Sequence, residues 1–314
     1  MHKSFKDLRI IFMGTPEFAA ASLEKLIMAG ANVVAVVTAP DKAAGRGLVL
    51  QQSAVKKYAL EKNIPALQPP KLKDTEFLKE LKNFQADIQI VVAFRMLPEV
   101  VWNMPPLGTI NLHGSLLPQY RGAAPINWAV INGEKYTGVT TFKLKHEIDT
   151  GDILLQETIE ICDSETAGEL HDRMKNVGAD LLLRTIQFIS DEGMKIIPQS
   201  DIASAAIQIR HAPKIFTETC LIDWNRSTDD VHNFIRGLSP YPAAFTTIED
   251  KQLKIFRSEK LHQSPQVAPG EMQTDNKTYL HFACTDGYID VKELQLQGKK
   301  KLGVGDFLRG WRKK

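Results

Sequence analysis

The sequence is poor in cysteine and in long apolar runs, and each shortage excludes a class of protein. Three cysteines occur in 314 residues, and their scattered positions indicate neither a disulfide framework nor a zinc site. We therefore expect free thiols and no bound metal. The first apolar run, residues 10–13, follows a polar start and is far too short for a signal peptide or a membrane-spanning helix. We expect a cytoplasmic protein without a membrane partner.

Net charge is also small, but it is unevenly distributed. The formal charge is +2, whereas residues 292–314 carry eight Lys or Arg against two acidic side chains, a local charge of +6. A basic patch of this kind attracts polyanions such as RNA. A solvated chain segment that aids solubility is the alternative. The first interpretation makes three lysines in this segment candidate RNA contacts: Lys299, Lys300 and Lys301.

Short β-branched runs alternate with helical segments in the first part of the chain. Their apolar residues are continuous, which is typical of strands buried on both faces of a parallel sheet. The pattern predicts an α/β fold with a Rossmann-like open, mostly parallel sheet, and ligands of such sheets bind beyond the carboxyl ends of the strands. We expect strands at residues 9–14, 32–38, 87–93 and 108–113, and helices at residues 17–29, 53–63 and 74–83.

The turn after the first strand argues against one common ligand of these sheets. It reads Gly14-Thr15-Pro16-Glu17-Phe18, so two glycines of the dinucleotide fingerprint G-x-G-x-x-G are missing. We therefore do not expect NAD(P).

After residue 136 the pattern changes. Residues 137–144 and 153–161 resemble a hairpin added to the sheet, and residues 166–189 form one long amphipathic helix. We expect a catalytic domain at residues 1–190, a linker at 191–210 and a second domain at 211–314. In the second domain Ser227 caps a helix, and five short β-rich runs indicate a smaller β-barrel of OB-like type. These runs are residues 244–248, 253–256, 279–283, 288–291 and 294–296.

Three polar side chains make a candidate acyl-transfer site. Asn111 and His113 are two apart on an extended segment, so their side chains project to the same side and can reach one substrate atom. An amide and a protonated imidazole are suitable donors for a developing oxyanion, and a carboxylate can hold the imidazole. Asp149, in the hairpin turn, is the candidate carboxylate. The alternative is a structural histidine beside an ordinary turn aspartate.

The loop at residues 41–47 combines small residues with two cations, Lys42 and Arg46. Its composition favours a mobile loop. Two interpretations remain open: a lid or RNA-contacting finger led by Arg46, or a solvated connection.

These segments together closely resemble the methionyl-tRNA formyltransferase family, within the wider group of 10-formyltetrahydrofolate-dependent formyltransferases. The resemblance covers nearly the whole chain. The wider group shares the Asn, His and Asp, whereas the Arg46 loop and the second domain narrow the choice. The segments are Ile11-Phe12-Met13-Gly14-Thr15-Pro16-Glu17-Phe18, Ala44-Gly45-Arg46-Gly47, Asn111-Leu112-His113-Gly114-Ser115-Leu116-Leu117-Pro118, Arg121-Gly122-Ala123-Ala124-Pro125-Ile126, Asp149-Thr150-Gly151-Asp152, Ile222-Asp223-Trp224 and Ser239-Pro240-Tyr241-Pro242.

The resemblance implies transfer of a formyl group from 10-formyltetrahydrofolate to the α-amino group of methionyl initiator tRNA, a step of translation initiation. Asn111 and His113 would polarise the formyl oxygen, while Asp149 orients His113. The second domain would bind tRNA, with Arg46 and Lys42 near the acceptor stem. We expect a monomer. The folate site would include four consecutive residues, Ser115, Leu116, Leu117 and Pro118.

Two segments depart from the family pattern. Arg95 stands where a glycine is usual, and Lys145-His146-Glu147-Ile148 precedes Asp149 where an aspartate and a glycine are common. Both departures concern the wall of the folate pocket.

Two rival functions remain. One rival is a formyltransferase for a small amine, such as a sugar nucleotide or glycinamide ribonucleotide. The other is a non-catalytic RNA-binding module.

Overall fold

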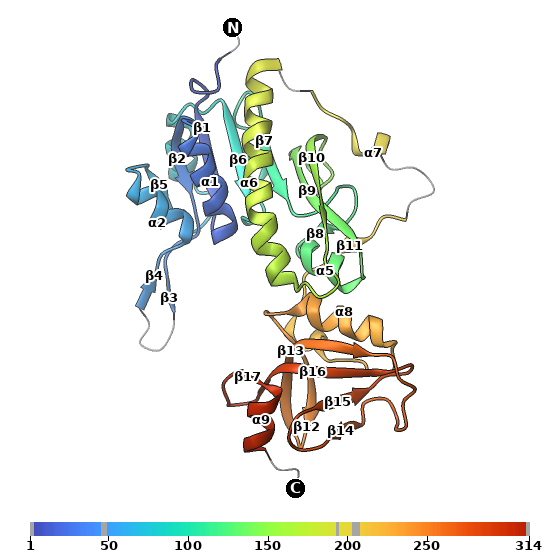
Figure 1. The fold of residues 1–314 in the computed structure, drawn as a ribbon. Coiled ribbons are helices and arrows are strands. Elements are labelled where there is room, and N and C mark those ends of the chain that lie inside the picture. The colour runs from blue at the N-terminus through green and yellow to red at the C-terminus, as the bar shows by residue number, and fades with distance from the viewer. Residues whose placement is uncertain (1–2, 45–48, 193–194, 203–207, 312–314) are drawn as a thin grey trace. The chain divides into compact units, whose positions relative to one another are not determined.

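The computed structural model describes residues 3–44, 49–192, 195–202 and 208–311 (Figure 1). It divides the chain into two compact units. Unit 1 comprises Met1–Arg121, Gly138–Ile159 and Asp172–Arg210, and unit 2 comprises Gly122–Thr137, Glu160–His171 and His211–Lys314. Each unit is therefore built from more than one stretch of the chain.

Unit 1 contains the predicted Rossmann-like sheet, and this prediction is confirmed. Seven strands lie in the order β10-β9-β7-β6-β1-β2-β5. The pairs from β7 to β5 are parallel, and β9 is antiparallel to β7. The strands are β1 (Ile10–Gly14), β2 (Val33–Val37), β5 (Ala66–Leu67), β6 (Ile88–Val92), β7 (Thr109–His113), β9 (Tyr136–Lys143) and β10 (Ile153–Glu160).

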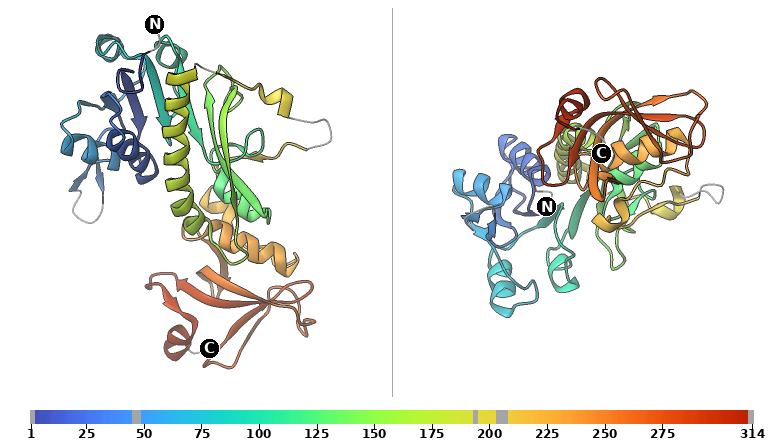
Figure 2. Two further views of the ribbon diagram at one scale, coloured as in Figure 1. Left: turned by 45° about the horizontal axis from the view of Figure 1, so that its top comes forward. Right: turned by 90° about the horizontal axis from the view of Figure 1, so that it is seen from below.

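Helices cover both faces of this sheet. On one face α1 (Glu17–Met28) and α6 (Ala167–Glu192) lie over the strands, and the left view of Figure 2 shows α6 running along the sheet. On the other face α3 (Thr75–Asn83) and α4 (Glu99–Trp102) bury Phe77, Leu81 and Val101 against Ile11, Met13 and Val91. Alternate residues of one strand thus serve two separate cores, which explains the continuous apolar runs in the sequence.

Local hydrogen bonds set several helix starts at the predicted places. The Asp74 carboxylate accepts from two backbone N–H groups of α3. Thr166 and Glu169 form a reciprocal capping box at the start of α6, because the Glu169 carboxylate accepts from the Thr166 backbone while Thr166 Oγ1 accepts from the Glu169 N–H. In unit 2 the predicted cap, Ser227, accepts from the Asp230 N–H.

Unit 2 contains the second predicted architecture, an antiparallel barrel-like sheet. Its strands lie in the order β12-β13-β16-β15-β14, with β17 also paired to β16. Two runs that the sequence separated, 288–291 and 294–296, form the single strand β16. The strands are β12 (Ala244–Ile248), β13 (Lys251–Leu261), β14 (Met272–Thr274), β15 (Leu280–Ala283), β16 (Tyr288–Leu296) and β17 (Leu302–Gly303).

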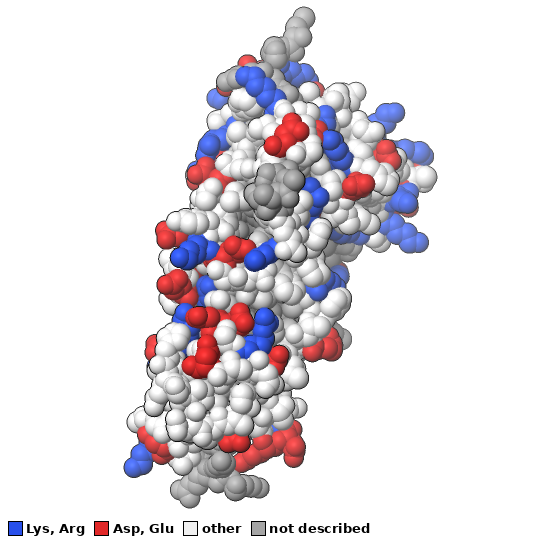
Figure 3. Space-filling view, turned by 90° about the vertical axis from the view of Figure 1, so that its right-hand side faces the viewer, with Lys and Arg blue, Asp and Glu red and all other residues white. Residues whose placement is uncertain are grey.

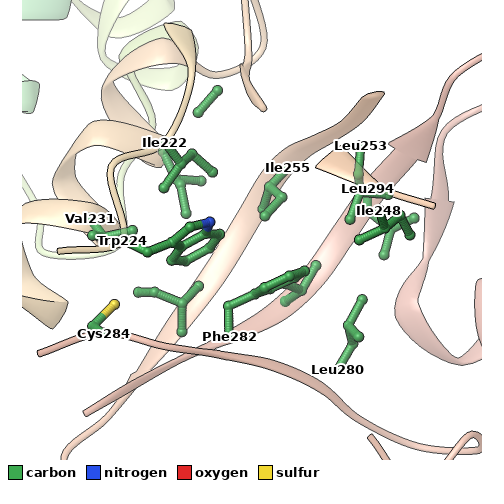
Figure 4. Close-up of a cluster of buried hydrophobic side chains, with 14 of the residues drawn as sticks. Ile222, Trp224, Val231, Ile248, Leu253, Ile255, Leu280, Phe282, Cys284 and Leu294 are labelled. Carbon is green, nitrogen blue, oxygen red and sulfur yellow. The ribbon is translucent and has the colours of Figure 1, made fainter. Parts of the chain in front are cut away.

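An aromatic stack fills the core of unit 2. The Trp224 indole lies 4.7 Å from the Phe282 ring, nearly parallel to it, among aliphatic side chains such as Ile255 and Leu294 (Figure 4). The indole N–H donates to Thr246 Oγ1 at 3.1 Å, so this buried polar group is satisfied. The core therefore holds α8 (Thr228–Leu238), whose Val231 and Ile235 belong to it, against the sheet.

Several short elements were not anticipated. Two of them, β3 and β4, form a hairpin where the sequence indicated only a mobile loop. None of the described helices combines the length and apolarity that crossing a membrane requires. The unanticipated elements are β3 (Lys42–Ala44), β4 (Val49–Gln51), β5, α4, β8 (Arg121–Gly122), α5 (Pro125–Ile131), α7 (Gln199–Ile202), β11 (His211–Ala212), the 3-10 helix Thr217–Cys220, β14, β17 and α9 (Val304–Gly310); α2 (Ala54–Glu61) was expected.

Candidate active site

Asn111 and His113 lie at the carboxyl end of β7, one strand from the middle of the unit 1 sheet. The register pairs Asn111 with Val91 on β6, so its side chain is on the α3 and α4 face and points away from α6. His113, two residues on, projects to the same face. It is 7% exposed, whereas Asn111 is partly exposed. The structure therefore places both donors side by side where ligands of parallel sheets bind.

The His113 ring is held on two sides. Its Nε2–H donates to the backbone carbonyl oxygen of Tyr120 at 3.0 Å, and its edge faces the Phe142 ring, 6.5 Å between centroids. A carbonyl oxygen only accepts, so Nε2 carries a hydrogen and Nδ1 is the nitrogen left for chemistry. A neutral ring can accept a proton at Nδ1, and a protonated ring can donate from it.

Asp149 faces that nitrogen. Its Oδ2 lies 3.8 Å from His113 Nδ1, which is too long for a hydrogen bond but close enough for an ion pair with a protonated ring. The side chains of both residues are largely buried, 8% and 11% exposed. The three predicted site residues thus come from β7 and from the turn between β9 and β10, and the His113 and Asp149 side chains meet.

The Asp149 turn has a demanding backbone. Asp149 itself has a φ of 55°, in the left-handed region that non-glycine residues seldom adopt. At Gly151 an added Cβ would lie 1.8 Å from the Lys143 carbonyl oxygen, so only glycine fits there. One departure from the family pattern is accommodated in this turn, because Lys145 Nζ pairs with Asp152 Oδ1 at 2.6 Å.

The predicted folate residues form a tightly bonded loop after β7. Ser115 is fully buried, and its hydroxyl donates to the Gln119 carbonyl at 2.6 Å. Thr140 on β9 accepts from the Leu117 N–H and donates to the Ser115 carbonyl. Leu117 and Pro118 are also buried, and Leu116 is partly exposed. The side chains of Ser115, Leu117 and Pro118 therefore face protein, and the loop offers a ligand mainly its backbone and shape.

Arg95, the other departure, joins two loops beyond the sheet. Its guanidinium donates to the carbonyls of Pro69 and Pro70 and lies over the Phe94 ring. Burial lowers the pKa of this guanidinium, and its Nε is buried without a hydrogen-bond partner. The substitution thus ties the segment after β6 to the segment after β5.

The predicted RNA contacts belong to both units. Lys42 is exposed on β3, and Arg46 lies outside the described residues. Lys299 and Lys300 are exposed in the turn after β16, whereas Lys301 pairs with a carboxylate and lies 5.4 Å from an aromatic centroid. On the face drawn in Figure 3, basic and acidic side chains are interspersed. Within unit 2, the Glu293 carboxylate therefore neutralises part of the positive charge of residues 299–301.

Sequence reasoning missed one residue that contacts the Asp149 turn. Gln199 on α7 donates to the backbone carbonyls of Asp149 and Gly151, and Arg121 donates to its side-chain oxygen. Arg121 stood within a family motif without an assigned contact. For Gln199 no sequence signal existed, because it is 50 residues from Asp149 and lies in the segment that the sequence indicated as a linker.

The cysteine thiols are not bonded to one another. All three cysteines are free. Burial raises the pKa of the Cys284 thiol to about 12, so this group stays protonated and is a poor nucleophile. Within the described ranges, no group of three or more His, Cys, Asp or Glu side chains could hold a metal ion.

The amino-acid sequence matches two family models. Formyl transferase matches residues 8–186, and Formyl transferase, C-terminal domain, matches residues 214–312. These matches define the class, the formyl transferases. A methionyl-tRNA formyltransferase from Bacteroides fragilis is 54% identical over 98% of this chain and 96% of its own length. The chain belongs to the methionyl-tRNA formyltransferase family.

Solved structures of more distant proteins share the fold. HypX from Aquifex aeolicus in complex with tetrahydrofolic acid has a TM-score of 0.65 and 18% identity; the likeness covers 98% of this chain, which spans 50% of HypX. An N-formyltransferase from Helicobacter canadensis with folinic acid and dTDP-3-aminofucose has a TM-score of 0.67 and 19% identity, covering 94% of this chain and all of that one. At such identities the likeness shows the fold alone.

Proposed function

We propose that this protein transfers the formyl group of 10-formyltetrahydrofolate to the α-amino group of methionyl initiator tRNA. The observation that carries the proposal is the arrangement at the end of β7: His113, fixed through Nε2, presents Nδ1 to the Asp149 carboxylate at 3.8 Å. The family of the chain supports the substrates, since its relative from Bacteroides fragilis is a methionyl-tRNA formyltransferase.

The chemistry needs little covalent help from the protein. The neutral amine attacks the formyl carbon, the bond from that carbon to N10 of the folate breaks, and the amine proton passes to N10. Negative charge develops on the formyl oxygen during the attack. Asn111 Nδ2–H and a protonated His113 Nδ1–H are the donors for that oxygen, while the Asp149 carboxylate stabilises the charged ring and helps move the proton. Holding amine and formyl carbon together supplies much of the remaining rate.

The loop at Ser115, Leu116, Leu117 and Pro118 contributes a wall of the folate site in this proposal. Its internal hydrogen bonds to Thr140 keep that wall in one shape before substrate arrives. No side-chain charge is offered by these four residues, so contacts to the folate come from backbone groups and from apolar surface.

The domain at residues 211–314 binds tRNA in this proposal, together with the loop at residues 41–47, whose sequence includes Lys42 and Arg46. Exposed Lys299 and Lys300 contact phosphates, so affinity falls as salt rises. Lys301 contributes less, because it already has a carboxylate partner.

The test supplies 10-formyltetrahydrofolate with charged initiator tRNA, charged elongator tRNA, or a nucleotide-linked amino sugar. We expect formylation of the initiator tRNA in preference to both others. Preference for the amino sugar would establish the small-amine rival instead. If wild type and His113→Ala bind RNA equally and neither transfers a formyl group, the protein is a non-catalytic RNA-binding module.

A further inference from the structure

A buried amide connects the catalytic turn to an arginine on the other side of it. Gln199 is 4% exposed, and its Nε2 donates to the backbone carbonyls of Asp149 and Gly151, each at 2.8 Å. Its Oε1 accepts from Arg121 Nε at 3.0 Å and Nη2 at 2.6 Å. All four residues belong to unit 1.

The arrangement uses every polar hydrogen of the amide. The Gln199 NH₂ group donates to the backbone carbonyls on both sides of Thr150. Asp149, whose backbone is in the left-handed region, lies in this same segment. A carboxamide can be turned over, which would point oxygen at those carbonyls. Arg121 prevents that, because its two N–H groups can pair only with an acceptor. Arg121 therefore determines which end of the amide faces the turn.

The held turn is the one that carries the Asp149 carboxylate to His113. Asp149 Oδ2 lies 3.8 Å from Nδ1, so a displacement of about 1 Å would separate the pair or change which atoms meet, and such displacements can cost about 10²-fold in rate. Hydrogen bonds to the backbone on both sides of Thr150 limit that displacement without touching the carboxylate.

We propose that Gln199 and Arg121 are positioning residues for formyl transfer, which hold the Asp149 turn so that its carboxylate stays beside His113 Nδ1. This inference rests on the proposed function. Neither residue has to contact either substrate, so their substitution lowers kcat while KM for tRNA and for folate changes little.

Two substitutions at Gln199 separate the effect of its hydrogen-bond donors from the effect of its side-chain shape. Gln199→Met keeps the length but loses all four hydrogen bonds, and Gln199→Glu keeps the pairing with Arg121 but has no N–H for the two carbonyls. We expect both to lower kcat by about tenfold to 10²-fold. Ser200→Ala, at the exposed neighbouring position, is the matched control and should keep the full kcat. Full turnover in Gln199→Glu would overturn the inference.

A second comparison shows whether the effect passes through Asp149. In an Asp149→Ala background the carboxylate is already gone, so adding Gln199→Met should lower kcat less than about threefold. An equal loss in both backgrounds would mean that Gln199 serves the fold and not the carboxylate.

A third variant covers the case in which Gln199→Met does not fold. Arg121→Met frees the amide to turn over and should lower kcat by about tenfold, with Arg121→Lys retaining part of the rate. Unchanged kcat in Arg121→Met would contradict the inference. An inactive wild-type protein would instead contradict the proposed function, which keeps the two failures distinct.

Discussion

Each unit buries a histidine, and the two imidazoles have opposite surroundings. His113 in unit 1 is 7% exposed and faces the Asp149 carboxylate, which is too far for a hydrogen bond. His232 in unit 2 is 6% exposed, lies near the Arg236 guanidinium and pairs through Nδ1 with Ser258 Oγ at 3.1 Å. Burial, followed by the nearby guanidinium, lowers the pKa of His232 to about 4.

Other charged groups of unit 2 also have partners within the protein. In unit 2, Lys301 pairs with Glu293, Lys292 pairs with Glu259 and Asp290, and Arg236 donates to backbone carbonyls. These groups are satisfied by the protein itself. In unit 1 the His113 Nδ1 and Asp149 Oδ2 atoms lie 3.8 Å apart, at the carboxyl end of β7, where ligands of parallel sheets bind. Position beside this binding face, more than burial, makes His113 the candidate catalytic histidine and His232 a structural one.

The largest expected effect separates the two histidines by activity. His113→Ala should lower kcat for formyl transfer by about 10²–10³-fold, because a donor to the formyl oxygen is lost. His232→Ala should leave kcat within about twofold, although it removes a buried side chain and lowers the melting temperature. Steady-state rates with charged initiator tRNA test both variants. Comparable losses of kcat would erase the distinction drawn here.

The next effect concerns the carboxylate. Asp149→Asn keeps the shape of the side chain but cannot balance a protonated imidazole, so kcat should fall by about 10²-fold. Retention of tRNA on a filter should not change. Asp152→Asn, which loses the pair with Lys145 but does not face His113, is the neighbouring control and should cost much less. Equal losses would assign the effect to the turn as a whole.

The structural histidine should make stability depend on pH. Its folded pKa of about 4 lies below the ordinary 6.5, so the unfolded chain binds more protons between these values and stability falls as pH falls. From pH 7 to pH 5 the loss is about 2 kcal/mol. Urea unfolding of wild type and His232→Gln measures it. A variant whose stability changes as steeply as the wild type would remove His232 from this dependence.

The smallest effect compares two adjacent lysines. Lys300→Ala should weaken tRNA binding and reduce the dependence of log affinity on log salt by about one, whereas Lys301→Ala should change both less because Glu293 already neutralises Lys301. Binding measured at several salt concentrations decides this. A larger change for Lys301 would show that RNA displaces its internal partner.

Local patterns in the sequence predicted much of this molecule. The continuous apolar runs predicted the main strands of unit 1. The helices expected at residues 74–83 and 166–189, and the helix expected after the Ser227 cap, begin within one residue of the expected places. Hairpin β3–β4 was not predicted, because strands of three residues are too short to show an alternating pattern. The two runs within β16 were split by Lys292 and Glu293, two partly exposed polar residues in the middle of one strand.

The sequence by itself determined the fold class. It also determined that the side chains of Asn111 and His113 lie on the same face of a strand, because periodicity and a spacing of two depend only on near neighbours along the chain. Only the tertiary structure decided that the Tyr120 carbonyl accepts from Nε2 of His113 and so leaves Nδ1 to face Asp149. It also decided that Gln199 donates to the backbone of the Asp149 turn and that Lys301 pairs with Glu293. Gln199 lies 50 residues from Asp149 and 78 from Arg121, so their hydrogen bonds follow from the path of the folded chain.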